Sequence, residues 1–276
     1  MKQYLEALKY CFENGNDVQS RAGNVRKSFG FQMHYDLSRG FPAVTTKKLA
    51  WKSVVSELLW FIEGSDDERR LAEILYEDKR ENLKHKNTIW TQNAESEYWK
   101  PKAKFEGDVG KIYGVQWRNF NGEDQLVNLI NSLKTDPNGR RHILSSWNPP
   151  EIKNMSLPAC HAFSQFFISN NQLSCQLYQR SCDMFLGVPF NIASYSLFTH
   201  MLARECNLEV GNFIHSLGDF HIYEEHFDQV KIQLRRDTKS LPFLEFKQKN
   251  ILSYSVSDFE LKNYNSHPSI KADMNI

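Results

Sequence analysis

The sequence contains no long hydrophobic run. No stretch approaches the ~20 consecutive apolar residues that a membrane-spanning helix needs. The opening segment MKQYLEALKYCF is interrupted by Glu6 and Lys9 before an apolar core of signal-peptide length can form. Internal repeats and low-complexity linkers are also lacking. These absences predict a chain that is neither membrane-bound nor secreted and that folds as one domain over residues 1–276.

The chain has few cysteines and a net charge close to zero. The five cysteines are odd in number and lack CxxC spacing, which argues against a disulfide framework and against a zinc site. They are Cys11, Cys160, Cys175, Cys182 and Cys206. We expect a cytoplasmic protein without a metal. Because 34 basic and 33 acidic side chains leave a formal charge of only +1, no broad field attracts nucleic-acid polymers, and any anion site must be local.

The chain does have 41% hydrophobic residues, enough at 276 residues for a large core. Apolar residues recur at helical spacing in three ranges, which we predict to be helices: 3–12, 51–62 and 124–134. In the second range, Trp60 and Phe61 lie off the main apolar stripe, so that helix should be buried on nearly all sides. Residues 65–111 are charged and lack a clean period, which predicts a surface excursion of short helices and loops.

A period of two then indicates strands. It occurs over residues 141–147, 160–168, 173–179 and 212–217, with shorter strands near Leu244 and Phe259. The second and third ranges are joined across Asn170-Asn171, which predicts a hairpin. A helix should follow Pro189 and continue to Leu202. Together these elements predict an α+β domain with a large mixed sheet covered by helices.

The most informative residues are a cysteine and a segment twenty residues after it. Cys160 lies in LPACHAF, and QLYQRSCDMFLGVPFNIASYS brings Arg180, Asp183, a Gly-Pro corner and Asn191. A thiol is a strong nucleophile, a guanidinium fits phosphate, and an amide donates and accepts side by side as reading a base edge requires. The combination predicts covalent catalysis on a nucleotide, although an isolated strand cysteine is more often a buried small hydrophobe. His161 should point to the opposite face and not act as its base.

The stretch from Leu157 to Tyr195 closely resembles the thymidylate synthase family, and the resemblance is not local. Other segments match that family in chain order: FPAVTTKKLAWKS, ELLWFIEGS, TIW, GDVGKIYGVQWR, GRRHILSSWNP, LGDFHIYEEH and a terminal HPSIKADMNI. The match runs from Arg21 to Ile276, and so many ordered segments make chance negligible.

The resemblance implies a fold, a reaction and partners. It implies a thymidylate synthase-like fold that forms a homodimer through its sheet, and a methyltransferase that converts dUMP to dTMP. The folate 5,10-methylenetetrahydrofolate would be the cosubstrate, serving as carbon donor and reductant, and no metal is implied. The RR pair, Arg140 and Arg141, would reach across the two-fold interface into the partner's site. Adjacent arginines opening a strand otherwise indicate edge protection.

The resemblance also implies roles for individual residues. Cys160 would attack C6 of uracil, with the other implied catalytic residues being Glu57, Tyr113, Asn191 and Asp183. The implied substrate-binding residues are Arg21, Arg140, Arg141, Arg180, Ser181, Asn191, His221 and Tyr223. The implied folate-binding residues are Ile89, Trp90, Asn93, Leu157, Asp183, Leu186, Gly187, Phe190, Tyr223 and Asn275. The remaining cysteines match no catalytic position.

Two of these residues stand out on physical grounds as well. Glu57 falls between Trp60 and Phe61 on a helical wheel, and a carboxylate among rings on a buried helix needs a partner or a proton; surface exposure is the alternative. Asn191 can satisfy the N3–H donor and O4 acceptor of uracil, whereas cytosine offers the reverse pattern. The alternative for Asn191 is to cap the helix that follows.

The match has four departures that bear on function. The loop after Arg21 is Ala22 to Arg26 and one residue short, Thr91 replaces an acid, Ser156 and Ala159 precede the nucleophile, and Asn275 replaces a penultimate alanine. If water in place of hydride met the last intermediate, the product would be 5-hydroxymethyl-dUMP, so a hydroxymethylase is the closest rival. A non-catalytic nucleotide-binding relative is the rival from another class.

Overall fold

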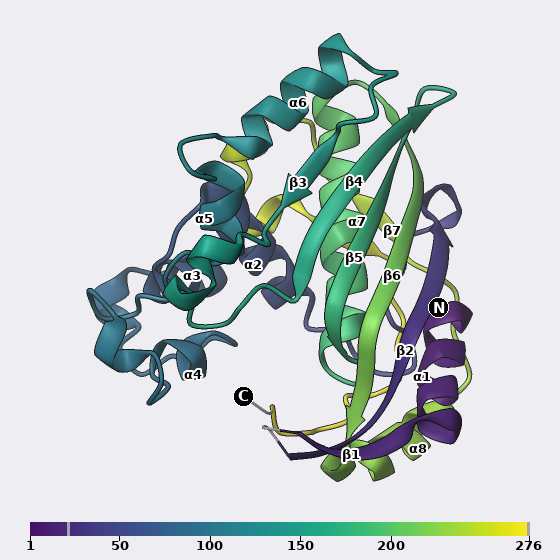
Figure 1. The fold of residues 1–276 in the computed structure, drawn as a ribbon. Coiled ribbons are helices and arrows are strands. Elements are labelled where there is room, and N and C mark those ends of the chain that lie inside the picture. The colour runs from purple at the N-terminus through teal and green to yellow at the C-terminus, as the bar shows by residue number, and fades with distance from the viewer. Residues whose placement is uncertain (21–22, 275–276) are drawn as a thin grey trace.

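The computed structural model describes residues 1–20 and 23–274, and its centre is a six-stranded mixed sheet (Figure 1). The strands lie in the order β1-β2-β6-β5-β4-β3. Their bounds are β1 Asn16–Ser20, β2 Gly23–Asp36, β3 Ile143–Ser145, β4 His161–Ser169, β5 Gln172–Asp183 and β6 Glu209–Tyr223. Only the β5–β6 pair is parallel, because a long helix carries the chain back between them. A separate antiparallel pair joins β7 Phe243–Glu245 to β8 Glu260–Lys262.

Eight α-helices pack around this sheet in the described part of the chain. They are α1 Lys2–Asn14, α2 Trp51–Glu63, α3 Glu68–Tyr76, α4 Thr91–Ala94, α5 Tyr113–Arg118, α6 Gln125–Thr135, α7 Gly187–Glu205 and α8 Phe227–Leu234. Short 3-10 turns span Leu37–Arg39, Arg80–Asn82, Lys100–Lys102, Pro149–Asn154, Glu224–His226, Ile251–Ser253 and Val256–Asp258. None of the described helices is long and apolar enough to cross a membrane.

The buried core lies between the sheet and the helices behind it. Figure 1 shows α7 running along the back of β5 and β6. Fourteen of its residues are buried, which fits an apolar helix at the centre of a fold. Every residue of α2 from Val54 to Ile62 is buried, as the off-stripe aromatic residues predicted. The α+β class and the large mixed sheet are therefore confirmed.

The local predictions are confirmed in kind and corrected at their ends. Asn170 and Asn171 have φ of 51° and 60°, the left-handed pair that a two-residue hairpin needs, so the hairpin is confirmed. The strand predicted over 141–147 is shorter and spans only Ile143–Ser145, as β3. The helix predicted to follow Pro189 begins two residues earlier, at Gly187. The strand predicted over 212–217 is longer, as β6. The sequence analysis did not predict β1, β2 or α8.

None of the described helices covers the other face of the sheet (Figure 1). Side chains on β4 alternate between buried and exposed, and the exposed set contains aromatic residues: Phe163 is 41% exposed and Phe167 61%. Register continues this face onto neighbouring strands through Ile143, Tyr178 and Ile214. A parallel strand pair is normally covered on both sides, so the bare face of β5 and β6 needs a partner surface.

Candidate active site

Cys160 immediately precedes β4, and two predicted site residues lie against it. Its backbone N–H donates to the Tyr113 hydroxyl at 2.7 Å. The nearest guanidinium nitrogen of Arg180, Nη2, lies 3.9 Å from Cys160 Sγ. Tyr113 comes from the first turn of α5 and Arg180 from β5, so three separate elements meet at the thiol.

The charge of the Cys160 thiol is balanced between burial and Arg180. Burial raises the pKa of Cys160, while Arg180 and hydrogen bonds from Tyr113 and Ser181 lower it without cancelling the effect of burial. The thiol is therefore protonated at neutral pH, and a further cation or donor near Sγ would favour the thiolate. Burial also lowers the pKa of His161 to about 4. His161 packs against the rings of Tyr113 and Tyr195, which fits a residue that is not the base for Cys160.

Arg180 is held in place by the chain segment before the nucleophile. Its Nε donates to the Ala159 carbonyl at 2.9 Å and its Nη2 to the Pro158 carbonyl at 2.7 Å. The guanidinium also lies over the Trp147 ring, with Cζ 5.2 Å from the ring centroid. Arg180 follows Tyr178 by two residues on β5, so both side chains leave the uncovered face of the sheet. The cation is thus fixed at the edge of the bare face.

Glu57 has the partner and the protonation that its surroundings require. It is 5% exposed, and the Trp90 indole N–H donates to its Oε1 at 2.7 Å. Burial raises the pKa of Glu57 to about 7, and the Trp90 hydrogen bond opposes that rise only in part. Surface exposure, the alternative reading of Glu57, is wrong. An acid with this pKa can hold or release a proton near neutral pH.

Asn191 is oriented by a chain of buried polar groups. Gln179 Nε2 donates to Asn191 Oδ1 at 3.1 Å and to the Ser181 carbonyl at 3.0 Å, which uses both of its protons. Gln179 Oε1 must therefore accept from His215 Nε2, 2.8 Å away. Burial lowers the pKa of His215 to about 3, so this imidazole is neutral. Asn191 lies in the second turn of α7, whose N-cap is Leu186, so the alternative that it caps this helix is wrong.

The predicted folate residues lie along the entry to α7 and on the Trp90 segment. Asp183 Oδ1 accepts the N–H groups of Phe185 and Leu186 at 2.9 and 3.2 Å, which shapes the turn into the helix. Four of the others are half-buried apolar or glycine positions, able to line a flat ring: Leu157, Leu186, Gly187 and Phe190. Trp90 and Asn93 are buried, whereas Ile89 is 37% exposed.

The predicted sugar contacts share one strand and one side. His221 and Tyr223 are two residues apart on β6, and their ring centroids are 5.3 Å apart. His221 Nδ1 lies 3.2 Å from Asp219 Oδ1, and Lys27 holds the other oxygen of that carboxylate at 2.8 Å. Alternation along β6 therefore places both side chains on the same side of the strand.

Several predicted residues are not brought to this site. Ile143 pairs with Gln165 on β4, five residues beyond Cys160, which is roughly 17 Å along the strand at ~3.3 Å per residue. Arg140 and Arg141 precede Ile143 and so lie still further from the thiol. The Thr91 hydroxyl donates to Glu68 Oε1 at 2.6 Å. Arg21, Ala22 and Asn275 lie outside the described residues. Arg26, from the altered loop, pairs with Asp17 at 2.7 Å.

Sequence reasoning missed the groups that orient the predicted residues. Gln179 and His215 hold Asn191, Trp147 supports Arg180, and Glu68 bonds to Thr91. One signal was available. Gln179 continues the core phase of its strand from Leu177, and a polar side chain in that phase needs a buried partner.

The site thus combines a thiol, a guanidinium, an oriented amide and an acid with a pKa of about 7, which are groups that covalent catalysis on a nucleotide can use. The family model described as thymidylate synthase matches residues 2–276, so this chain belongs to the thymidylate synthase family. It is 46% identical over 286 residues to a curated thymidylate synthase of Mycoplasma pneumoniae, and the match spans 99% of each chain.

Proposed function

We propose that this protein methylates dUMP to dTMP with 5,10-methylenetetrahydrofolate as the cosubstrate. The observation that carries the proposal is that Cys160 lies against Arg180 and Tyr113, while the Tyr113 ring packs 5.9 Å from the ring of Trp90, the partner of Glu57. Residues 1–276 act as one catalytic domain, and the five free thiols fit a reducing cytoplasm.

Cys160 is the nucleophile. Its Sγ forms a bond to C6 of the uracil, and the electron pair of the C5–C6 double bond moves toward C5 and O4. The thiol proton passes to water as Sγ attacks, and the Arg180 guanidinium, 3.9 Å from Sγ, stabilises the thiolate that forms. The dUMP phosphate is an anion, so it would oppose this ionisation if it drew Arg180 away from Sγ. Arg180 is held by carbonyl groups of residues 158 and 159, so it can bind phosphate without leaving Cys160.

Glu57 handles the protons of the uracil ring. With a pKa of about 7, its carboxyl can give a proton to O4 as charge develops there and accept it back as the ring regains its double bond. The Trp90 N–H holds Oε1 in one orientation during this exchange.

The folate supplies a one-carbon unit and a hydride, so that dTMP leaves together with dihydrofolate. The residues of this chain that would hold it fit a flat, partly polar ring: Trp90 and Asn93 beside Glu57, and Leu186, Gly187 and Phe190 at the start of α7. Asp183 already accepts two backbone N–H groups with Oδ1, and Oδ2 can accept from a pterin N–H.

The active form is a homodimer joined through the bare face of the sheet. Arg140 and Arg141 lie too far from their own Cys160 to reach it, and they stand at the opposite end of the face from Arg180. A two-fold axis through that face brings this end of one protomer toward the thiol of the other. The paired arginines then complete the phosphate site of the partner.

Product analysis tests the function. Purified protein incubated with dUMP and methylenetetrahydrofolate should release dTMP, identified by mass; a hydroxymethyl product, one oxygen heavier, would replace the proposal by its closest rival. Cys160→Ser should abolish turnover while dUMP binding, measured by calorimetry, is kept. Turnover surviving in the serine variant would remove Cys160 from the mechanism.

A further inference from the structure

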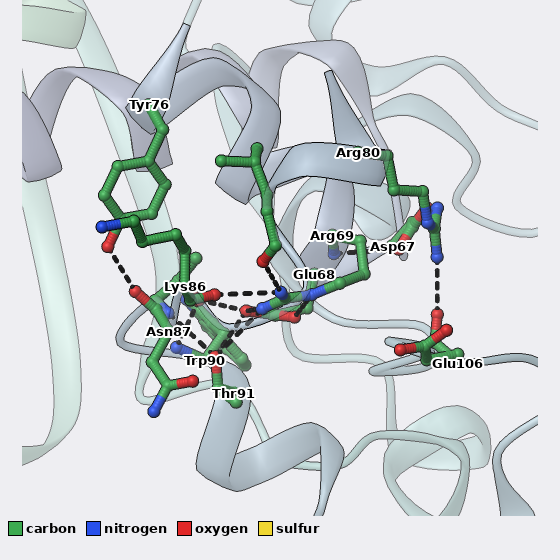
Figure 2. A network of polar contacts seen from close by, with 12 residues as sticks. Asp67, Glu68, Arg69, Tyr76, Arg80, Lys86, Asn87, Trp90, Thr91 and Glu106 are labelled. Carbon is green, nitrogen blue, oxygen red and sulfur yellow. Dashed lines mark hydrogen bonds and ion pairs between the residues drawn. The ribbon is translucent and has the colours of Figure 1, made fainter. Parts of the chain in front are cut away.

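A buried ion pair lies beside the segment that carries Trp90 (Figure 2). Glu68 and Arg69, at the start of α3, are joined by two hydrogen bonds of 2.6 Å, and their side chains are 2% and 10% exposed. Burial alone would raise the pKa of Glu68, but hydrogen bonds from Arg69, Thr88 and Thr91 hold it below its usual value. Glu68 is therefore charged, and none of the roles assigned above uses it.

One oxygen of that carboxylate closes the turn before α4. Thr88 and Thr91 both donate their hydroxyl protons to Glu68 Oε1, each at 2.6 Å. The same hydroxyls accept backbone N–H groups: Thr88 Oγ1 from Trp90 at 3.0 Å, and Thr91 Oγ1 from Thr88 at 2.8 Å. Each hydroxyl has a single proton, so its direction is fixed by the carboxylate.

Arg69 fixes the chain that enters this turn. Its Nη1 donates to the carbonyls of Leu83 and Lys86 at 3.2 and 2.9 Å, and its Nη2 reaches Thr91 Oγ1 at 3.3 Å. Figure 2 shows these groups converging between α3 and the 86–91 segment. The ion pair thus holds the backbone before Trp90 and the side chain of the residue after it.

Trp90 in turn holds Glu57 through its indole N–H. We propose that Glu68 is a positioning residue of the reaction, which fixes Trp90 through Thr88 and Thr91 so that the indole N–H stays aimed at Glu57. The inference rests on the proposed function only in taking Glu57 as the acid that handles protons. Thr91, a departure from the family pattern, is on this view the partner of an acid that stands at position 68.

The ionisation of Glu57 separates positioning from a purely structural role. Among the described residues, two titratable groups face Glu57: Tyr113 of α5 and Tyr195 of α7. Burial raises the pKa of both tyrosines well above 10, so both are neutral. Loss of the indole hydrogen bond raises the pKa of Glu57, because that bond favours the charged form. The charge change in Glu68→Gln would by itself have the opposite effect. Removing the Glu68 carboxylate leaves the Arg69 cation unpaired, which would lower the pKa of Glu57.

The test is a carboxyl titration of the full-length protein labelled with ¹³C at glutamate, with Glu57→Gln used to assign the Glu57 signal. Glu68→Gln and Thr88→Val should each raise the pKa of Glu57, by up to about two pH units if the hydrogen bond to the charged carboxylate is lost completely. Their kcat–pH profiles should shift in the same direction, with KM for dUMP unchanged. Glu63→Gln is the control. It removes a carboxylate that pairs with Arg70 at 2.9 Å, and the Glu63 side chain is 43% exposed and outside the hydrogen bonds that hold Trp90.

A pKa of Glu57 that stays constant or falls in the variants would overturn the inference, whatever happens to activity, and would leave the proposed function standing. A rise in the variants of a protein that makes no dTMP would keep the inference and refute the function. If Glu68→Gln fails to fold, Thr88→Val decides, since it cuts one hydroxyl link and leaves the ion pair intact.

Discussion

Glu57 is a buried carboxylic acid hydrogen-bonded to Trp90, whose ring packs against those of Trp60, Phe61 and Tyr113. Its proton links the proposed catalysis to stability. Folded Glu57 keeps its proton up to about pH 7, whereas a glutamate in an unfolded chain releases it near ~4.3. Between these values the folded state holds more protons. The stability that neutral Glu57 contributes is therefore complete below about pH 4 and is lost as the pH rises through 7.

We expect Glu57→Gln to remove this pH dependence together with the activity. From pH 5 to pH 8 the native protein should lose roughly 3 kcal/mol more of its unfolding free energy than the variant does, as an upper bound from ~1.4 kcal/mol per factor of ten in ionisation. Urea unfolding of both proteins at the two pH values measures the difference. Parallel pH curves would mean that Glu57 ionises normally in the folded protein.

At the same scale, we predict that Asn191 carries the choice of base. Asn191→Asp should weaken the use of dUMP by about 1–3 kcal/mol, the cost of an unpaired buried polar group, and improve the relative use of dCMP. The carboxylate can still accept from Gln179 Nε2, so the fold should tolerate it. Competition assays with both nucleotides give the ratio, and an unchanged preference would show that Asn191 does not read the base.

At the scale of elements, the close approach of α5 to α2 places Tyr113. A Cβ on Gly114 would lie 2.5 Å from the Phe61 carbonyl oxygen and 2.6 Å from Phe61 Cα, both backbone atoms that cannot rotate away. The two helices can therefore meet at this distance only if residue 114 has no side chain.

Gly114→Ala should push α5 away from α2, costing about 1–3 kcal/mol as an overpacked contact, and should lower kcat by moving the Tyr113 hydroxyl from Cys160. Thermal unfolding and steady-state kinetics measure the two effects. Gly187→Ala is the stability control, since its Cβ would meet Asp183 at 3.5 Å, an ordinary contact. If the Gly114→Ala protein kept native stability, the contact between α5 and α2 would be less close than the structure shows.

At the scale of the whole molecule, the proposed homodimer would account for both the uncovered sheet face and the distance of Arg140 and Arg141 from Cys160. If Arg141 acts in the partner's site, Arg141→Glu and Cys160→Ser are each inactive, but their mixed dimer contains one site with an intact cysteine and arginine. Free exchange of subunits should then restore about a quarter of native activity, because half of the dimers are mixed and one site in two is complete.

The control mixes Arg141→Glu with the double variant Cys160→Ser/Arg141→Glu, which cannot assemble a complete site. Rescue in that mixture would point to an artefact, and absence of rescue in the first mixture, after exchange is verified by mass, would place Arg141 in its own subunit.

The sequence by itself determined the features that depend on neighbours in the chain. The periodicity of residues 51–62 predicted a buried helix, and two adjacent asparagines predicted the turn between β4 and β5; both are local effects of side-chain period and left-handed φ. The motif around Cys160 likewise indicated the family, while the individual site roles remain predictions.

Tertiary structure alone decided the features that depend on pairing between distant residues. Strand β2 has no clean alternation and exists because β6 pairs with it across almost two hundred residues. Asn191 is oriented by Gln179 and His215, and Trp90 by Glu68, through hydrogen bonds whose partners no local pattern identifies. The physical reason is that buried polar groups must be satisfied wherever the fold brings them together, and the packing of the whole chain sets that place.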